Sequence, residues 1–191
     1  HFIVVKDANI KKNISEYFVK EQRLRAKLKM KFPTPNYKGL SGAPGFIVIC
    51  SDMRWIKAFP ILKNDESDLN RMYKENAERI LLQSLAAATM SSHLAAASLG
   101  YNVWWVTAIG QEQAQKDIKP LLGIPEELSV LDILLFGPPF QEPYKRWRKP
   151  IETIMNINKF NMDNFQTDEE IDEWVLNARH KVMFKDASNI D

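Results

Sequence analysis

The stretch SLAAATMSSHLAAASLGYNVWWVTAIG, residues 84–110, decides the fold of this chain. Its first part is rich in Ala and Ser and predicts a long helix, which Gly100 ends as a left-handed C-terminal residue. The aromatic run that follows predicts a strand. A short helix closing on LLGIPEEL (121–128), an apolar strand in LDILLFG (131–137) and the basic segment EPYKRWRKP (142–150) come next. No single piece is a catalytic motif, so the order of the pieces carries the information.

The other elements follow from apolar periodicity and from the positions of Gly and Pro. Strands are expected at 2–5, 45–50, 102–108 and 130–136, and helices at 9–30, 75–99, 111–122 and 168–178. Thr167 and Glu170 are spaced as a capping box for the last helix. We expect a loop over 32–44 and, over 51–74, a mobile excursion with a helical turn or two.

The alternation of strands and helices ordinarily suggests a parallel, doubly wound sheet. However, no Gly-rich phosphate loop follows any strand. The first strand–helix junction, KDANIKKN, lacks the glycines that a dinucleotide-binding fingerprint needs. The residues therefore argue against a Rossmann fold.

The 191 residues are enough for one substantial domain or a tight pair of subdomains, and the contents of 45% apolar and 26% charged residues are ordinary for a globular protein. A net charge of +2 does not indicate a nucleic-acid or membrane partner. The single cysteine, Cys50, excludes a disulfide framework and is expected to be a buried structural thiol. No feature indicates secretion, so we expect a cytoplasmic protein. The chain reads as a strand from His1, so we expect it to have lost its beginning.

The basic segment is the first candidate site. In an extended chain Arg146 and Arg148 project to the same side. Two guanidinium groups on one side suit a phosphomonoester, which accepts bidentate hydrogen bonds. A solvated charged turn, or a nuclear-localisation or RNA-binding patch formed by Lys145–Lys149, would explain the same residues.

The tryptophan pair is the second candidate. Trp104 and Trp105 are adjacent in a strand, so their side chains face opposite sides of the sheet. One ring would fill the core while the other lines a surface or pocket, and the small residues after them would let a flat ring approach the backbone. Two core or interface aromatics are the alternative interpretation.

Other chemistries find little support in the sequence. There is no HExxH motif and no Cys/His pair, so we expect no metal site, and no G-x-S-x-G elbow exists. His93 lies alone in the Ala-rich helix and is expected to be structural. The carboxylate pairs at Glu126–Glu127 and Asp168–Glu173 lie at helix starts, where they favour the helix dipole. The small residues of 84–99 permit close helix packing, in the interior or in a dimer seam.

Taken in order, these pieces resemble the nitroreductase-like family of FMN-dependent oxidoreductases. The residues that carry the resemblance run from Phe2 to Pro150: HFIVVKD (1–7), APGFIVI (43–49), the Ala-rich helix ending in Leu99-Gly100, LLGIPE (121–126), the strand ending in Gly137, and RWRKP (146–150).

The resemblance implies an α+β fold, with a mostly antiparallel sheet wrapped by helices, and an intertwined homodimer that binds FMN at the subunit interface. It assigns Arg146 and Arg148 to the FMN phosphate and Trp105, Val106, Thr107 and Ala108 to the isoalloxazine, with a backbone N–H near Thr107 facing flavin N5. We expect residues 1–150 to form this domain, with 51–74 as a lid, and 151–191 to be a C-terminal extension. The family's other FMN contacts would precede His1.

The resemblance also implies a function, namely electron transfer from NAD(P)H through FMN to a small acceptor such as a nitroaromatic, a quinone, an enone or a halogenated phenol. Three alternatives stay open. They are flavin and oxygen chemistry of the dimethylbenzimidazole-synthase type, a non-catalytic flavin-binding or protein-interaction module, and a nucleic-acid role for the basic segment.

Overall fold

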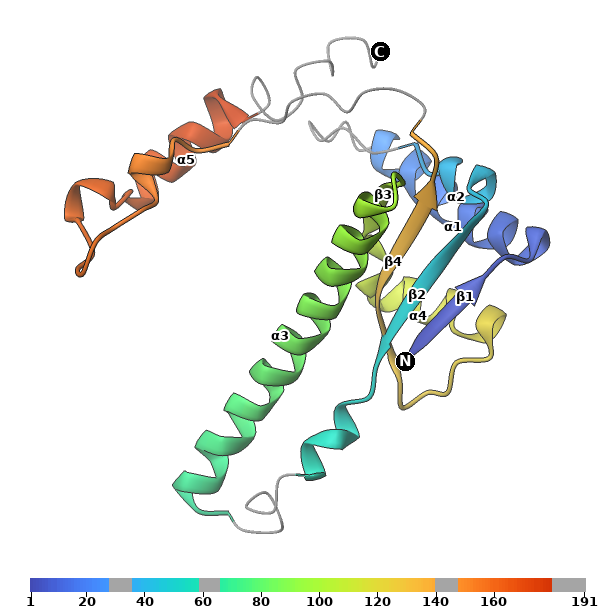
Figure 1. Cartoon of the computed structure of the whole chain (residues 1–191), viewed down its shortest axis with the longest axis horizontal. Coiled ribbons are helices and arrows are strands. Elements are labelled where there is room, and N and C mark those ends of the chain that lie inside the picture. Colours follow the sequence, from blue (N-terminus) through green and yellow to red (C-terminus); the bar gives the residue numbers. More distant parts are fainter. Residues whose placement is uncertain (28–35, 59–65, 140–147, 180–191) are drawn as a thin grey trace. The chain divides into compact units, whose positions relative to one another are not determined.

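The computed structural model describes residues 1–27, 36–58, 66–139 and 148–179. The chain forms two compact units (Figure 1). The N-terminal unit comprises His1–Arg23 and Asn36–Phe140, and the C-terminal unit comprises Leu24–Pro35 and Gln141–Asp191. Each unit is described by itself below.

The N-terminal unit is built on a four-stranded sheet. Its strands are β1 (Phe2–Val5), β2 (Gly45–Ser51), β3 (Asn102–Val106) and β4 (Ser129–Gly137), in the order β1-β2-β4-β3. All three pairings are antiparallel. The four predicted strand positions are confirmed, whereas the parallel sheet that the alternation suggested is wrong.

The position of β4 explains that error. Strands β2 and β3 are both antiparallel to β4, so they run in the same direction. The long helix α3 (Asp68–Ser98) therefore does connect two parallel strands, as the alternation suggested. The last strand, β4, enters between them and forms the hydrogen bonds with both. The antiparallel sheet implied by the family resemblance is correct.

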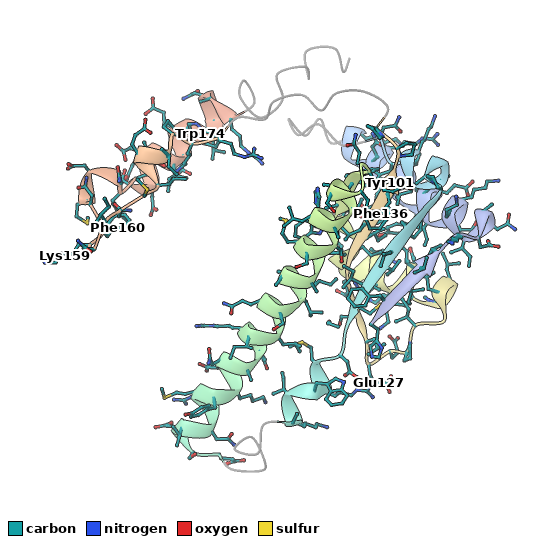
Figure 2. All side chains as sticks on the ribbon, in the orientation of Figure 1. Tyr101, Glu127, Phe136, Lys159, Phe160 and Trp174 are labelled. Carbon is teal, nitrogen blue, oxygen red and sulfur yellow. The ribbon has the colours of Figure 1, made fainter. Side chains whose placement is uncertain are left out.

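The main core lies on one face of the sheet, beneath α1 (Ala8–Lys27), α2 (Gly39–Gly42) and α4 (Glu112–Ile118). Ile14 and Phe18 of α1 are fully buried against Phe46 and Ile133 of the sheet. Tyr37 stacks on Phe18 with 4.9 Å between ring centroids. Figure 2 shows side chains filling the space between α1 and the sheet.

Helix α3 lies on the opposite face, against β3 and β4. It begins at Asp68, earlier than the predicted residue 75, because Ser67 caps it by accepting a hydrogen bond from the Asn70 N–H at 3.2 Å. It ends at Ser98, one residue before the predicted end, and Gly100 takes the predicted left-handed conformation at φ 81°. Tyr101, which follows this turn, lies at the same end of the sheet as Phe136 (Figure 2). By length and composition alone α3 could cross a membrane, a criterion that core helices of soluble proteins also meet.

The helix predicted at 111–122 is interrupted. Helix α4 ends at Ile118, and a 3₁₀ turn, η4 (Pro120–Leu122), follows. Pro120 has no N–H to continue the α-helical ladder, which accounts for the break. Gly123, at φ 62°, ends the turn.

The remaining elements are short. In the excursion predicted at 51–74, a 3₁₀ turn, η1 (Met53–Ala58), supplies the expected helical turn, and residues 59–65 lie outside the described part. The C-terminal unit contains η5 (Ile151–Thr153), η6 (Met162–Asn164) and α5 (Asp168–Asn177). The capping box of Thr167 and Glu170 is confirmed.

Candidate functional site

The stretch predicted to lie against a flavin spans the end of a strand and a turn. Strand β3 ends at Val106, two positions before the predicted end, because Thr107 turns the chain with φ −93° and ψ −16°. A 3₁₀ turn, η3 (Ala108–Gly110), follows. Thr107 is exposed, whereas Ile109 is fully buried and anchors the turn in the core. The turn therefore presents Thr107 and Ala108 at the edge of the unit.

The two tryptophans face opposite sides of the sheet, as predicted. Trp104 packs on the main core, where its ring centroid lies 5.6 Å from that of Tyr37. A Cβ added at Gly39 would come within 3.2 Å of the Trp104 ring, so this glycine allows the close approach. Trp105, paired with Leu134, therefore points to the face that carries α3.

Backbone N–H groups are the polar feature of the exposed turn. The carbonyls of Thr107 and Ala108 accept hydrogen bonds from the N–H groups of Gly110 and Gln111, at 3.1 and 3.3 Å. Among the described residues, no acceptor is assigned to the N–H groups of Thr107 and Ala108 themselves. The first N–H groups of any helical turn lack intrahelical partners. The edge of the unit thus offers donors to an acceptor atom of a bound molecule.

Gln115 of α4 fixes this turn to the sheet. Its amide nitrogen donates to the carbonyl of Ile109 at 2.8 Å and to the carbonyl of Val130 at 2.7 Å. Its amide oxygen accepts the Val130 N–H at 2.8 Å. One side chain therefore joins η3 to the start of β4. The sequence reasoning missed it, because a glutamine in a short amphipathic helix is indistinguishable from a solvent-facing polar residue.

Polar side chains of α3 and of the sheet lie in the layer between them. Asp132 of β4 is only 4% exposed, and Thr89 of α3 donates its hydroxyl to the Asp132 carboxylate at 3.2 Å. His93 lies one helical turn after Thr89. The Nδ1 atom of His93 and the Nε1 atom of Trp105 are both buried, and neither has a hydrogen-bond partner among the described residues. Sequence reasoning treated His93 as merely structural and did not single out Asp132.

The predicted phosphate-binding pair is only partly described. Arg146 and Lys145 lie outside the described residues. Arg148 is exposed and belongs to the C-terminal unit, whereas Trp105–Ala108 belongs to the N-terminal unit. Next to Arg148, Lys149 donates to the side-chain carbonyl of Gln166 at 2.5 Å.

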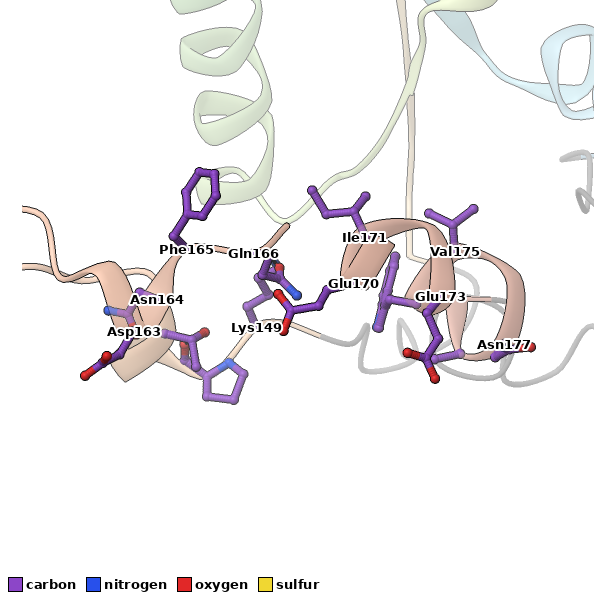
Figure 3. Close-up of a pocket in the computed structure, with 14 residues that line it drawn as sticks. Lys149, Asp163, Asn164, Phe165, Gln166, Glu170, Ile171, Glu173, Val175 and Asn177 are labelled. Carbon is purple, nitrogen blue, oxygen red and sulfur yellow. Dashed lines mark hydrogen bonds between the residues drawn. The ribbon is translucent and has the colours of Figure 1, made fainter. Parts of the chain in front are cut away.

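The C-terminal unit has a cavity of about 820 Å³ (Figure 3). Its apolar lining includes Phe165, Ile171 and Trp174, and its polar lining includes Lys149 and Glu170. All lining residues come from this unit. Within the described ranges no group of three or more His, Cys, Asp or Glu residues could hold a metal ion.

The pKa values of Glu126 and Cys50 are shifted from their ordinary values. Hydrogen bonding to the Lys119 ammonium at 2.8 Å lowers the pKa of Glu126 and fixes the turn of LLGIPE. Burial raises the pKa of the Cys50 thiol, against the opposing effects of the chain N-terminus and Lys119. Cys50 is fully buried, as predicted.

Comparison with known proteins gives consistent matches. The model of the nitroreductase family matches residues 1–137. A protein of Archaeoglobus fulgidus named "Putative NADH dehydrogenase/NAD(P)H nitroreductase" is 31% identical over 142 residues, which cover 74% of this chain and 62% of that relative. The chain thus spans less than two thirds of that relative's length.

Solved structures share the fold at low identity. B. megaterium NfrA1 matches with a TM-score of 0.57 and 19% identity, over 92% of this chain and 62% of its own. The NADPH:FMN oxidoreductase of Vibrio harveyi, solved in complex with NAD+, matches with a TM-score of 0.53 and 17% identity, over 97% of this chain and 69% of its own.

Proposed function

Because this chain belongs to the nitroreductase family, we propose that it acts as an FMN-dependent oxidoreductase, passing electrons from NAD(P)H to a small organic acceptor. The observation that carries this proposal is the turn after β3. In that turn Thr107 is exposed and Ala108 is half-buried, and the N–H groups of both have no acceptor among the described residues. Gln115 holds the turn by donating to the carbonyl of Ile109, and it is itself fixed to β4 by donating to the Val130 carbonyl and accepting the Val130 N–H.

The residues at this turn fit the ring of FMN. Flavin N5 and the neighbouring carbonyl oxygen are acceptors, and the turn supplies donors. Val106 is buried in the core, so it would meet the ring through its backbone, whereas Thr107 is exposed. When bound, FMN supplies the redox chemistry, accepting a hydride and passing electrons on. The protein's part is to orient the ring and limit access to it.

The arginines of the basic segment would hold the phosphate. We assign this role to Arg146 and Arg148, whose guanidinium groups suit a dianionic phosphomonoester. The exposure of Arg148 is compatible with it. Arg148→Ala should weaken FMN retention far more than Lys145→Ala. Equal losses would mean that the segment acts as a diffuse basic patch.

A second copy of the chain would cover the outer face of α3. Leu82, Met90 and Leu94 are 47%, 45% and 62% exposed, and with Ala86 they form one row at four-residue spacing. Such rows are the ridges that pack between neighbouring helices. We propose that this row forms the dimer seam, that 51–74 acts as a lid and that 151–191 extends the domain.

The activity is tested by anaerobic half-reactions. NADH or NADPH should bleach the visible absorption of the FMN-loaded protein, and a nitroaromatic or quinone should then restore it without oxygen. Recovery only with oxygen would favour oxygen-dependent flavin chemistry instead. Bound FMN that neither nucleotide reduces would mean a non-catalytic flavin-binding module.

A further inference from the structure

The layer between α3 and the sheet contains a polar cluster that the proposed function does not use. The Thr89 hydroxyl lies 3.2 Å from a carboxylate oxygen of Asp132 and 3.0 Å from the carbonyl of Leu85. A hydroxyl has one hydrogen to donate, so these two acceptors share it. The nearly buried carboxylate therefore retains capacity to accept another hydrogen bond.

The Thr89–Asp132 contact fixes which residues of α3 lie beside which residues of the sheet. Helix α3 runs in the same general direction as β4, and β3 is antiparallel to β4 (Figure 1). From Thr89 to His93 the helix rises by about 6 Å. From Asp132 to Leu134, the partner of Trp105, the strand advances by about 6.8 Å. His93 is thus level with Trp105, and its side chain leans back toward Asp132, since helical side chains tilt toward the N-terminus.

The unpartnered atoms at this level are complementary. The indole N–H of Trp105 can only donate, and the Nδ1 atom of a neutral imidazole accepts when Nε2 carries the proton. The other ring nitrogen, Nε2–H, then donates in the direction of Asp132. A protonated imidazole has no acceptor atom, so it cannot hold the indole N–H.

Within the described part of the N-terminal unit, the elements around the cluster bring few other charges to it. Strands β2 and β3 contain no ionisable side chain besides Cys50, which faces the main core, and Asp132 is the only charged residue of β4. The charged residues of α3 all precede Ile80, more than three turns before His93. In η1, which also contacts α3, Arg54 is paired with Asp52, and Lys57 is exposed. Among the described residues of these elements, Asp132 is therefore the charged group nearest in level to His93.

We propose that His93 is a positioning residue for Trp105. In its neutral form, after a rotation of the ring, it accepts the hydrogen bond of the Trp105 indole N–H while Asp132 and Thr89 hold its other side. Protonation of His93 breaks that bond. The Trp105 side chain, at the start of the stretch predicted to lie against the flavin, is then fixed at high pH and released at low pH. The consequence for flavin binding rests on the proposed function, whereas the hydrogen bond does not.

The hydrogen bond is tested on the 191-residue chain without flavin, by following the indole N–H resonances in nitrogen-15 spectra between pH 8 and pH 5, the range in which histidines ordinarily titrate. Trp105→Phe assigns the resonance. We expect the Trp105 resonance to move, and its protection from exchange to be lost, in one transition. Trp104, on the opposite face, is the internal control and should not follow that transition.

Two variants assign the transition to the cluster. His93→Gln keeps a neutral acceptor at every pH and should abolish it. Asp132→Asn, which keeps the shape of the side chain but replaces the carboxylate with an amide, should alter the transition if the carboxylate holds the other side of the ring. A Trp105 resonance that does not respond to pH, or that responds unchanged in His93→Gln, would overturn the proposal.

A last measurement tests the hydrogen bond and the proposed function separately. With FMN added, the wild type should bind the flavin more weakly at pH 5 than at pH 8, and His93→Gln should lose most of that difference. A Trp105 transition without any FMN binding would leave the hydrogen bond standing and refute the proposed function. FMN binding without a Trp105 transition would leave the proposed function standing and refute the hydrogen bond.

Discussion

Replacing Gln115 by Met tests how the turn after β3 is held. Methionine has a similar length and helix propensity, so the change removes hydrogen bonds and little else. Three bonds are lost, to the carbonyls of Ile109 and Val130 and from the Val130 N–H. The backbone groups left behind are partly buried.

The expected loss of stability follows from those three bonds. Each contributes roughly 0.5–1.5 kcal/mol net, which gives about 1.5–4.5 kcal/mol for the set. Partial access of water to the freed groups favours the lower half of that range, about 2 kcal/mol. For a chain of 150–250 residues each kcal/mol lowers the midpoint of thermal unfolding by about 2–4 °C, so we expect a decrease of about 4–8 °C.

Gln113→Met is the matched control in the same helix. Gln113 is exposed, and its amide donates only to Asp117, at 3.0 Å. Its replacement should change the midpoint by no more than about 1–2 °C, in line with the small effects of exposed helix pairs. Thermal unfolding by circular dichroism compares the two, and hydrogen exchange of the Val130 amide should accelerate only in Gln115→Met. Equal midpoints for the two variants would refute the role given to Gln115.

Three further predictions concern other parts of the N-terminal unit. Gly123→Ala should destabilise the fold by about 1–2 kcal/mol, because φ of 62° is unfavourable for a residue with a Cβ. Gly42→Ala is the control and should not destabilise the fold in this way, since Gly42 has open space around it and no positive φ. Urea unfolding compares the two variants, and equal stabilities would contradict the prediction. The pKa of Glu126 is lowered by the ammonium of Lys119, so this pair stabilises the fold at neutral pH and is lost as the pH falls below the ordinary value of 4.5; unfolding midpoints of Glu126→Gln should therefore fall less steeply in acid, and parallel curves would contradict the pairing. The raised pKa and full burial of Cys50 predict that a thiol reagent modifies it only at the rate of unfolding, whereas labelling as fast as a free thiol would contradict that burial.

The positions of the strands could be predicted because apolar, β-branched runs are local features of the sequence. Their pairing could not, because Gly45–Ser51 and Ser129–Gly137 are far apart along the chain, and only the folded sheet shows that β4 enters between β2 and β3. The antiparallel arrangement was available from the family resemblance alone.

The boundaries of the helices were predictable where a cap is local. The capping box at Thr167 and the glycine after Leu99 fixed two ends correctly. The start of α3 was missed because Ser67 lies in a polar run that resembles a loop. The break at Pro120 was missed because the apolar spacing continues through it.

Some features of the candidate site were also predictable from the sequence, and others were not. The alternation of Trp104 and Trp105 follows from strand geometry and was predicted. The hydrogen bonds of Gln115 and the Thr89–Asp132 contact join residues that only the fold brings together. Thr89 and Asp132 are 43 positions apart, and nothing in the sequence around either residue indicates the other. The roles of Arg146 and Arg148 remain predictions of the resemblance.

The most direct test of FMN binding is the visible absorption spectrum of the purified protein. The spectrum is recorded on the protein as isolated, and again after FMN has been added and unbound flavin has been removed on a sizing column. We expect a yellow protein: the flavin should elute with the protein, and its spectrum should be shifted from that of free FMN. A protein that is colourless as isolated and stays colourless after incubation with FMN would contradict it.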